Sequence, residues 1–152
     1  MKLTQYTDYS LRVLIFLGAL EEDERVNVQE IASIYHISKH HLTKVVHNLG
    51  KLGLIETMRG RGGGIRLDKK PDQINIGWLI RQTEEDFHLV ECFNPEENGC
   101  VINSACTLKG ILNQALEAYF ATLDRFTLAD LLANRSSLQA LILNPSFKTE
   151  IH

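Results

Sequence analysis

The sequence lacks any hydrophobic run long enough to cross a membrane. Its longest nearly apolar stretch, residues 11–20, has only ten residues, whereas a membrane-spanning helix needs about 20. The N-terminal region also lacks the basic cluster and the small-residue cleavage site of a signal peptide. These absences predict a soluble, cytoplasmic protein that does not associate with a membrane.

Proline and cysteine are scarce as well, with 3 residues of each among 152. Three cysteines cannot form a disulfide framework that pairs every thiol. The remaining composition, 44% hydrophobic and 23% charged with 10 glycines, is that of an ordinary globular protein and argues against collagen-like or disordered chains. The length predicts one compact domain, or two small units that share a core.

The chain is slightly acidic overall, but its basic residues are concentrated in one segment. Residues 36–70 carry eight Lys or Arg side chains and two acidic ones, whereas residues 71–152 carry five basic and eleven acidic side chains. A basic segment inside an acidic protein indicates a partner with phosphates on one side only. Charge alone, however, favours the simpler alternative of an ordinary solvated surface.

Two short helices joined by a tight turn are expected after residue 26. Asn27 and Glu30 have the spacing of a capping box and predict a helix that ends near Tyr35. The chain then turns, and Ser38 is a favourable N-cap for a second helix. Apolar residues follow one another in this second helix at helical spacing, which predicts that one of its faces is buried.

A β-hairpin is expected directly after the second helix. Gly53 is a typical helix stop, and residues 54–58 and 65–67 have strand patterns on either side of a glycine-rich tip, residues 60–64. Two helices with a tight turn and a following hairpin constitute a winged helix-turn-helix, which docks its second helix in the major groove of DNA. The sequence therefore predicts a mainly α fold with one small β-hairpin.

The candidate DNA contacts are the polar face of the second helix and the tip of the hairpin. The tip glycines would let the backbone approach a duplex closely, and the tip arginines could enter a minor groove. The alternative is a small helical bundle whose basic residues only keep it soluble. The candidate DNA-binding residues are Ser38, Lys39, His40, Thr43, Lys44, His47, Arg59 and Arg61.

The glycine-rich tip does not fit the phosphate-binding loop of a nucleotide-dependent enzyme. No Lys-Ser or Lys-Thr pair follows it, and it lies inside a hairpin rather than between a strand and a helix. We therefore expect no enzymatic activity.

The C-terminal half combines a polar loop with a long helix. A short helix over residues 76–83 precedes the loop, and an apolar stripe then runs from Cys106 to Phe126. A stripe of this length predicts packing against a second copy, because winged-helix proteins commonly bind DNA as two-fold dimers. Thr127 and Asp130 would cap a final short helix. The predicted division is a winged helix-turn-helix domain (1–75), a segment with the cysteine loop and the dimerisation helix (76–134), and a tail without predicted structure (135–152).

The three cysteines, Cys92, Cys100 and Cys106, lie in a polar stretch with the spacing C-x7-C-x5-C. This spacing lacks the paired C-x2-C units of structural zinc sites and the close ligand run of ferredoxins. Three soft thiolates suit an iron–sulfur cluster or zinc, and either would need one more ligand from elsewhere in the protein. The alternative is three unligated thiols in a small core.

Five features of the sequence are informative when they are taken together. They are the stretch from Leu3 to Arg12, the tip Arg59-Gly-Arg-Gly-Gly-Gly64, the stretch Asn75-Ile-Gly-Trp78, the segment Val90-Glu91-Cys92, and the three cysteines. On these features the chain, over residues 1–134, resembles the dimeric winged-helix iron–sulfur regulators of bacteria. Within that family it is most similar to the nitric-oxide-sensing repressors.

The resemblance implies a homodimer with an iron–sulfur cluster, 4Fe–4S rather than 2Fe–2S, on the three cysteines of each subunit. It also implies that Asp8 of the partner subunit completes the ligand set, and Arg12, one helical turn later, could orient that carboxylate. A sibling branch uses a histidine three residues after the last cysteine, where this sequence has Lys109. His88 and Glu91 are alternative fourth ligands, and the alternative for Asp8 is a carboxylate that only interacts with the helix dipole.

The function that the resemblance implies is transcriptional repression. A homodimer would bind palindromic double-stranded DNA and release it when nitric oxide acts on the cluster. One alternative is a regulator of the same family that responds to iron or to the supply of iron–sulfur clusters. Another is a small redox protein without DNA binding, which would need no basic recognition helix.

Overall fold

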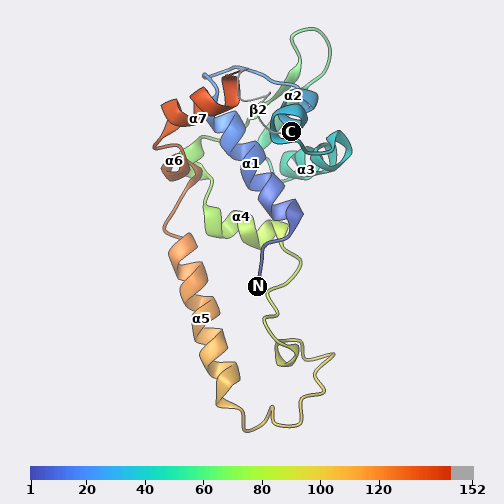
Figure 1. The fold of residues 1–152 in the computed structure, drawn as a ribbon, viewed down its shortest axis with the longest axis vertical. Helices are drawn as coiled ribbons and strands as arrows, with labels where there is room; N and C mark the ends of the chain where they lie inside the picture. The colour runs from blue at the N-terminus through green and yellow to red at the C-terminus, as the bar shows by residue number, and fades with distance from the viewer. Residues whose placement is uncertain (145–152) are drawn as a thin grey trace.

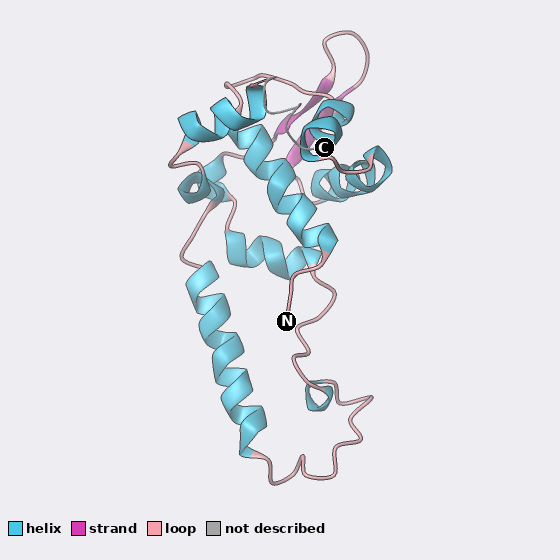
Figure 2. Cartoon of the chain, in the orientation of Figure 1, coloured by secondary structure: helices cyan, strands magenta, loops and turns pink. Residues whose placement is uncertain are grey.

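The computed structural model describes residues 1–144 and shows an elongated molecule (Figure 1). A compact body holds the first half of the chain and its last described helices, while one long helix and an extended loop project from that body (Figure 2). No helix in this part of the chain combines the length and the apolar character needed to span a bilayer. The elements are α1 (Gln5–Ala19), α2 (Val28–Tyr35), α3 (Lys39–Lys51), β1 (Ile55–Met58), β2 (Gly64–Leu67), η1 (Pro71–Gln73), α4 (Ile76–Thr83), η2 (Glu91–Phe93), α5 (Thr107–Leu123), α6 (Leu128–Leu131) and α7 (Arg135–Leu143).

Helix α1 lies inside the body and is buried along most of its length. Thr4 caps its N-terminus by accepting a hydrogen bond from the Thr7 N–H at 3.3 Å. Val13, Leu14 and Phe16 have almost no exposed surface, and the helix packs against α3, β2, α4, α6 and α7. This burial follows from the sequence, since apolar residues cover nearly every face of the helix.

Both caps predicted for the helix-turn-helix are present. The Asn27 side chain accepts from the Glu30 N–H at 2.9 Å, and the Glu30 carboxylate accepts from the Asn27 N–H at 3.2 Å, which starts α2. His36 adopts a left-handed conformation, with φ 53°, and turns the chain. Ser38 then caps α3 by accepting from the His41 N–H at 3.4 Å. These caps and the turn place α3 against both α1 and α2.

The predicted wing is a two-stranded antiparallel sheet in which Ile55 pairs with Leu67. Its base is attached to the chain before α2, because Val26 and Ile65 exchange two backbone hydrogen bonds of 3.2 and 2.8 Å. Gly64 lies beside this bridge with φ 137°, and a Cβ there would meet the Val26 carbonyl oxygen at 2.8 Å. Only glycine therefore allows the wing to approach so closely.

The long helix α5 is joined to the body through Asp124, directly after its last residue. Arg81 of α4 donates two hydrogen bonds to this carboxylate, at 2.6 and 2.9 Å, and the Asn75 side chain donates to the Asp124 carbonyl at 2.7 Å. The hydrogen bond from Arg81 holds the pKa of the Asp124 carboxyl below its usual value. A Cβ on Gly77 would lie 2.0 Å from the same carboxylate, so this contact requires glycine.

Two features of the C-terminal part differ from the expectation. Helix α5 ends at Leu123 rather than at Phe126, because the contacts of α4 with the following residue stop it there. The first residues of the predicted tail form α7, whose Arg135 and Gln139 side chains donate to the Ala19 carbonyl at 3.2 and 2.7 Å and so satisfy the end of α1. The rest of the tail lies outside the described residues, and the division into domains stays a prediction.

Candidate functional site

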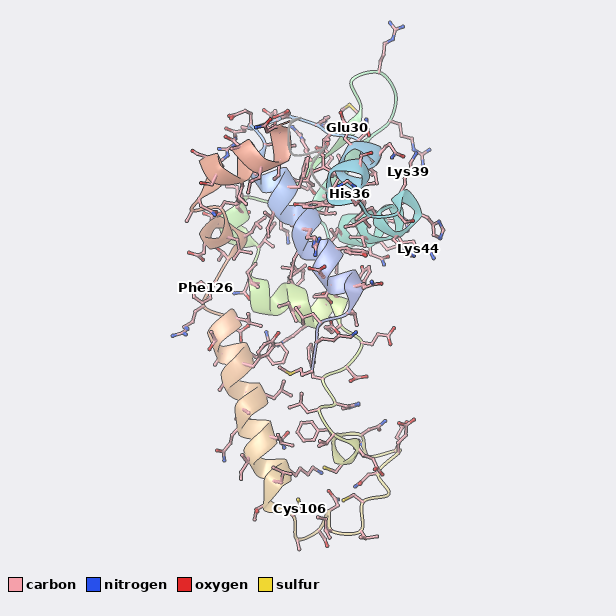
Figure 3. The ribbon with its side chains drawn as sticks, viewed as in Figure 1. Glu30, His36, Lys39, Lys44, Cys106 and Phe126 are labelled. Atoms are coloured by element: carbon pink, nitrogen blue, oxygen red, sulfur yellow. The ribbon has the colours of Figure 1, made fainter. Side chains whose placement is uncertain are left out.

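The outer face of α3 exposes all six of the polar residues predicted for this helix and its cap. Leu42, Val45, Val46 and Leu49 pack on the opposite face into the core, and this packing fixes which side chains point outward. Figure 3 shows Lys39 and Lys44 on the outer side of α3. The exposed residues are Ser38, Lys39, His40, Thr43, Lys44 and His47.

The wing carries its exposed positive charge at the tip. Arg59 and Arg61 are both exposed, and neither forms an ion pair with any described residue. Arg66, at the base of the wing, is neutralised instead: its Nε lies 2.6 Å from the Glu56 carboxylate, and it also pairs with Asp23. The hydrogen bond from Arg66 lowers the pKa of the Glu56 carboxyl, because it favours the ionised form.

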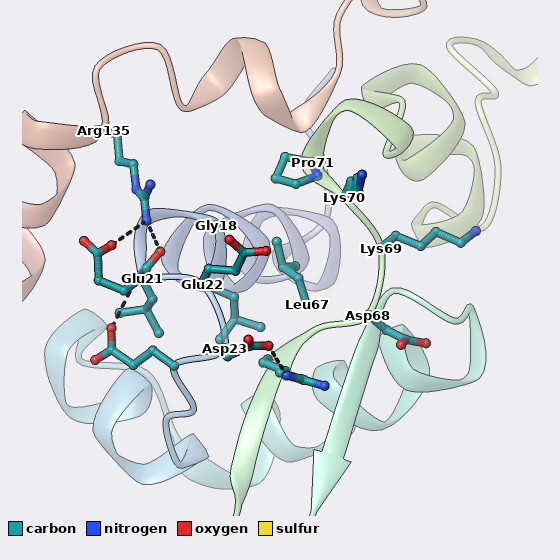
Figure 4. Close-up of a pocket in the computed structure, with 14 residues that line it drawn as sticks. Gly18, Glu21, Glu22, Asp23, Leu67, Asp68, Lys69, Lys70, Pro71 and Arg135 are labelled. Atoms are coloured by element: carbon teal, nitrogen blue, oxygen red, sulfur yellow. Dashed lines mark hydrogen bonds and ion pairs between the residues drawn. The ribbon is translucent and has the colours of Figure 1, made fainter.

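An acidic turn, residues 21–24, faces this base of the wing across a cavity of about 390 Å³ (Figure 4). Arg135 lies 3.8 Å from the Glu21 carboxylate and also donates to the Leu20 carbonyl. The acidic turn therefore takes part in neutralising Arg66 and Arg135. Arg59 and Arg61 at the tip have no acidic partner in the part of the chain that the structure describes.

A second hollow separates the wing from the N-terminal ends of α2 and α3. It is lined by Gln29 of α2, Lys39 and Thr43 of α3, and Thr57 of β1. Gln29 and Thr57 are missing from the set predicted from the sequence. The signal for Gln29 was its position in the first turn of α2, between the two residues of the capping box, where backbone N–H groups favour negatively charged groups.

The three cysteines occupy one loop between α4 and α5. All three are free and half-buried. Cys92 lies in the short turn η2, and Cys106 is the N-cap of α5, at the end of the helix that points away from the body (Figure 3). No three His, Cys, Asp or Glu side chains come close enough to hold a metal ion within residues 1–144. The structure therefore gathers the thiols in one loop without assembling a metal site inside one chain.

Asp8 lies in the first turn of α1 and is held by Arg12. Both carboxylate oxygens are engaged, by the Arg12 Nε at 3.2 Å and by its Nη2 at 2.9 Å. Arg12 lies over the Tyr35 ring, 5.8 Å from its centroid, and the Tyr35 hydroxyl donates to the Arg12 carbonyl at 3.1 Å. Burial raises the pKa of Tyr35 to about 12. Arg12 therefore contacts both oxygens of the Asp8 carboxylate, and its role in orienting a ligand stays a prediction.

The alternative fourth ligands have polar partners within the chain, as Asp8 does. The Glu91 Oε1 accepts a hydrogen bond from the Gly99 N–H at 2.5 Å. His88 interacts with Asp86, whose carboxylate lies 3.6 Å from its Nδ1. The Lys109 Nζ, at the position where the sibling branch has a histidine, lies 3.4 Å from the side-chain oxygen of a loop asparagine.

Comparison with known proteins gives consistent matches. A family model described as Rrf2, an iron-dependent transcriptional regulator, matches residues 3–134. The chain is 57% identical to the HTH-type transcriptional regulator NsrR of Bacillus licheniformis, over 93% of this chain and 99% of the relative. It is 56% identical to NsrR of Bacillus subtilis, over 93% and 97%. The solved oxidized form of CymR from Staphylococcus aureus is 26% identical, with a TM-score of 0.69 over 88% of this chain and 97% of that chain.

These matches confirm the predicted fold class, because the structural neighbours are winged-helix regulators. They also confirm that the protein regulates transcription and is not an enzyme. The chain belongs to the Rrf2 family of transcriptional regulators.

Proposed function

We propose that the protein is a cytoplasmic transcriptional repressor that binds palindromic DNA as a homodimer under the control of a nitric-oxide-sensitive iron–sulfur cluster. One observation carries this proposal. An Rrf2-family chain presents three free cysteines in one loop, together with a carboxylate, Asp8, on the helix that packs against its recognition helix. Nitric oxide is the signal that the resemblance to the nitric-oxide-sensing branch implies.

The arrangement of α3 and the wing supports DNA binding. The exposed face of α3 presents two lysines and several hydrogen-bonding side chains, which suits a major groove, and the wing tip adds Arg59 and Arg61. In a two-fold dimer the two copies of α3 would contact one face of the duplex about one helical turn, or ~34 Å, apart. Such an arrangement requires a palindromic operator.

Helix α5 supports the dimer. None of its residues is buried within the described chain, and Leu108 and Ile111 are 55% and 60% exposed. Leu112, Leu116 and Tyr119 on the same stripe are only partly covered. An apolar stripe of this length on a projecting helix is expected to bind a second copy of the chain.

The thiols of the loop fit an iron–sulfur cluster in their chemistry. They are free of disulfides and are the soft ligands that such clusters use. Cys106 also begins α5, where the helix dipole stabilises negative charge. We assign three ligands of a 4Fe–4S cluster to these cysteines and the fourth to Asp8 of the partner subunit. When bound, the cluster supplies iron that reacts with nitric oxide.

The position of Asp8 explains how ligation of the cluster would affect DNA binding. Asp8 is held by Arg12 on α1, and α1 packs against α3 through its buried face. A constraint on the N-terminal end of α1 therefore also restricts the recognition helix. If Asp8 is bound by the loop of the partner subunit, the two copies of α3 are held at a fixed separation.

The wing contact predicts a loss of affinity that does not depend on operator sequence. Arg61→Ala should weaken binding to every sequence and lower the slope of log affinity against log salt by about 2, because the dimer loses one phosphate contact in each subunit. Gel shifts at several salt concentrations measure both quantities. Arg125→Ala, which removes an exposed charge beyond α5, is the control and should bind as the wild type does. Unchanged binding by Arg61→Ala would contradict the wing contact.

The dimer interface predicts that Leu116→Glu produces a monomer. An unpaired carboxylate buried between two copies of α5 costs several kcal/mol, and sedimentation velocity reports the change in mass. Gln114→Glu adds the same charge to an exposed position of α5 and should leave the dimer intact. If Leu116→Glu remained dimeric, this face of α5 could not be the interface.

The ligand set predicts different outcomes for the thiols and the carboxylate. Replacing any one of the three cysteines by Ala should prevent stable assembly of the cluster, because each thiolate is a strong ligand. Asp8→Ala should still allow assembly but should speed cluster loss under nitric oxide and weaken operator binding. Anaerobic absorbance and gel shifts measure these effects. Wild-type behaviour of Asp8→Ala in all of them would remove Asp8 from the site.

The description of the family as iron-dependent favours one second candidate, a regulator that responds to iron or to cluster supply. The same anaerobic protein distinguishes the two signals. Release of DNA on exposure to nitric oxide at constant iron supports the proposed function, whereas release only on removal of iron supports the alternative.

A further inference from the structure

The loop that carries the cysteines is closed by one of its own side chains. The Glu91 Oε1 accepts a hydrogen bond from the Gly99 N–H at 2.5 Å, eight residues further along the chain. Glu91 directly precedes Cys92, and Gly99 directly precedes Cys100. Neighbouring Cα atoms are about 3.8 Å apart, so each of the first two cysteines lies one residue away from this contact. The contact therefore keeps the backbone at Cys92 near the backbone at Cys100.

Local hydrogen bonds fix both ends of this closure. On the first side, Cys92 lies in the turn η2, in which the Phe93 and Asn94 N–H groups donate back to the Val90 and Glu91 carbonyls, at 3.0 and 3.1 Å. On the second side, the Asn98 side chain accepts from the Cys100 N–H at 3.1 Å. The two cysteines therefore lie in two short hydrogen-bonded turns, and the Glu91 side chain joins one turn to the other.

The contact is also specific in its geometry. A Cβ at position 99 would lie 3.1 Å from the Glu91 Oε1, so glycine gives the carboxylate room to reach this backbone N–H. A hydrogen bond to an ionised acceptor is stronger than one between neutral groups. Glu97, in the same loop, is exposed and has no side-chain partner among the described residues, so proximity to the cysteines alone does not produce such a contact.

We infer that Glu91 is a positioning residue that closes the cysteine loop and holds Cys92 and Cys100 as a pair. We assign Glu91 this role rather than that of fourth ligand, since its Oε1 already accepts from the Gly99 N–H of the same loop. Closing a loop costs conformational entropy, and this hydrogen bond lowers the cost before any metal is bound. The relevance of the pair to the cluster rests on the proposed function, but the pairing itself belongs to the metal-free chain.

The first test uses the metal-free full-length protein and oxidised glutathione. A cysteine thiolate attacks the glutathione disulfide, and the second cysteine then displaces glutathione, so one protein disulfide forms and two molecules of reduced glutathione are released. Peptide mapping gives the equilibrium constant of the Cys92–Cys100 disulfide. Glu91→Ala should lower this constant about fivefold to tenfold, the size expected for the net contribution of one typical hydrogen bond.

Two matched variants separate positioning from a general effect on the loop. Glu91→Gln retains an oxygen that can accept from the Gly99 N–H and should recover most of the lost constant. Glu97→Ala removes a neighbouring carboxylate and should match the wild type. An unchanged constant in Glu91→Ala would overturn the proposal, and so would a Glu91→Gln variant as impaired as Glu91→Ala.

A second measurement keeps this proposal distinct from the proposed function. After anaerobic supply of iron and sulfide, Glu91→Ala should bind a cluster with the wild-type absorption spectrum but lose it faster. A changed spectrum would identify Glu91 as a ligand and overturn the inference. If the wild type binds no cluster, the proposed function fails, whereas the disulfide constants of the metal-free protein still decide the role of Glu91.

Discussion

The burial of α1 is the constraint on which the rest of the structure depends. This helix packs against the recognition helix, the wing, α4 and the two C-terminal helices at once, and Val13 and Leu14 have no exposed surface. A close-packed interior does not let one helix slide independently of its neighbours. A displacement of the N-terminal turn of α1 is therefore coupled to a displacement of the DNA-binding face of α3.

The second half of the described chain is incomplete by itself. Helix α5 has an apolar stripe without a buried residue, and Val101 and Ile102, beside Cys100, are 94% and 60% exposed. The cysteine loop likewise provides three thiols, but no three His, Cys, Asp or Glu side chains of residues 1–144 come together to hold a metal ion. One arrangement would complete both features, a second copy that covers α5 and brings its own α1 to the loop. The contacts of Arg81 with Asp124 give α5 a firm attachment to the body, so a dimer formed by α5 would also orient the two winged helices.

Much of the fold could be predicted because its signals are local. The capping boxes that start α2 and α6, the Ser38 cap of α3 and the glycine-rich wing each depend on residues within a few positions of one another. The features that could not be predicted are long-range. The end of α5 is set by a carboxylate that pairs with α4, and α7 is stabilised by carbonyl groups more than a hundred residues earlier in the chain. The contact of Glu91 with Gly99 has no periodic signature in the sequence either.

The central claim of this account is that the Asp8 carboxylate serves the cysteines of the other subunit. A mixed dimer of Cys92→Ala subunits and Asp8→Ala subunits, isolated anaerobically with two different affinity tags, tests it directly. Such a dimer retains one complete ligand set only if ligation crosses between subunits. The account predicts one cluster per mixed dimer, lost under nitric oxide at the wild-type rate. A mixed dimer that loses its cluster as fast as the Asp8→Ala homodimer would contradict it.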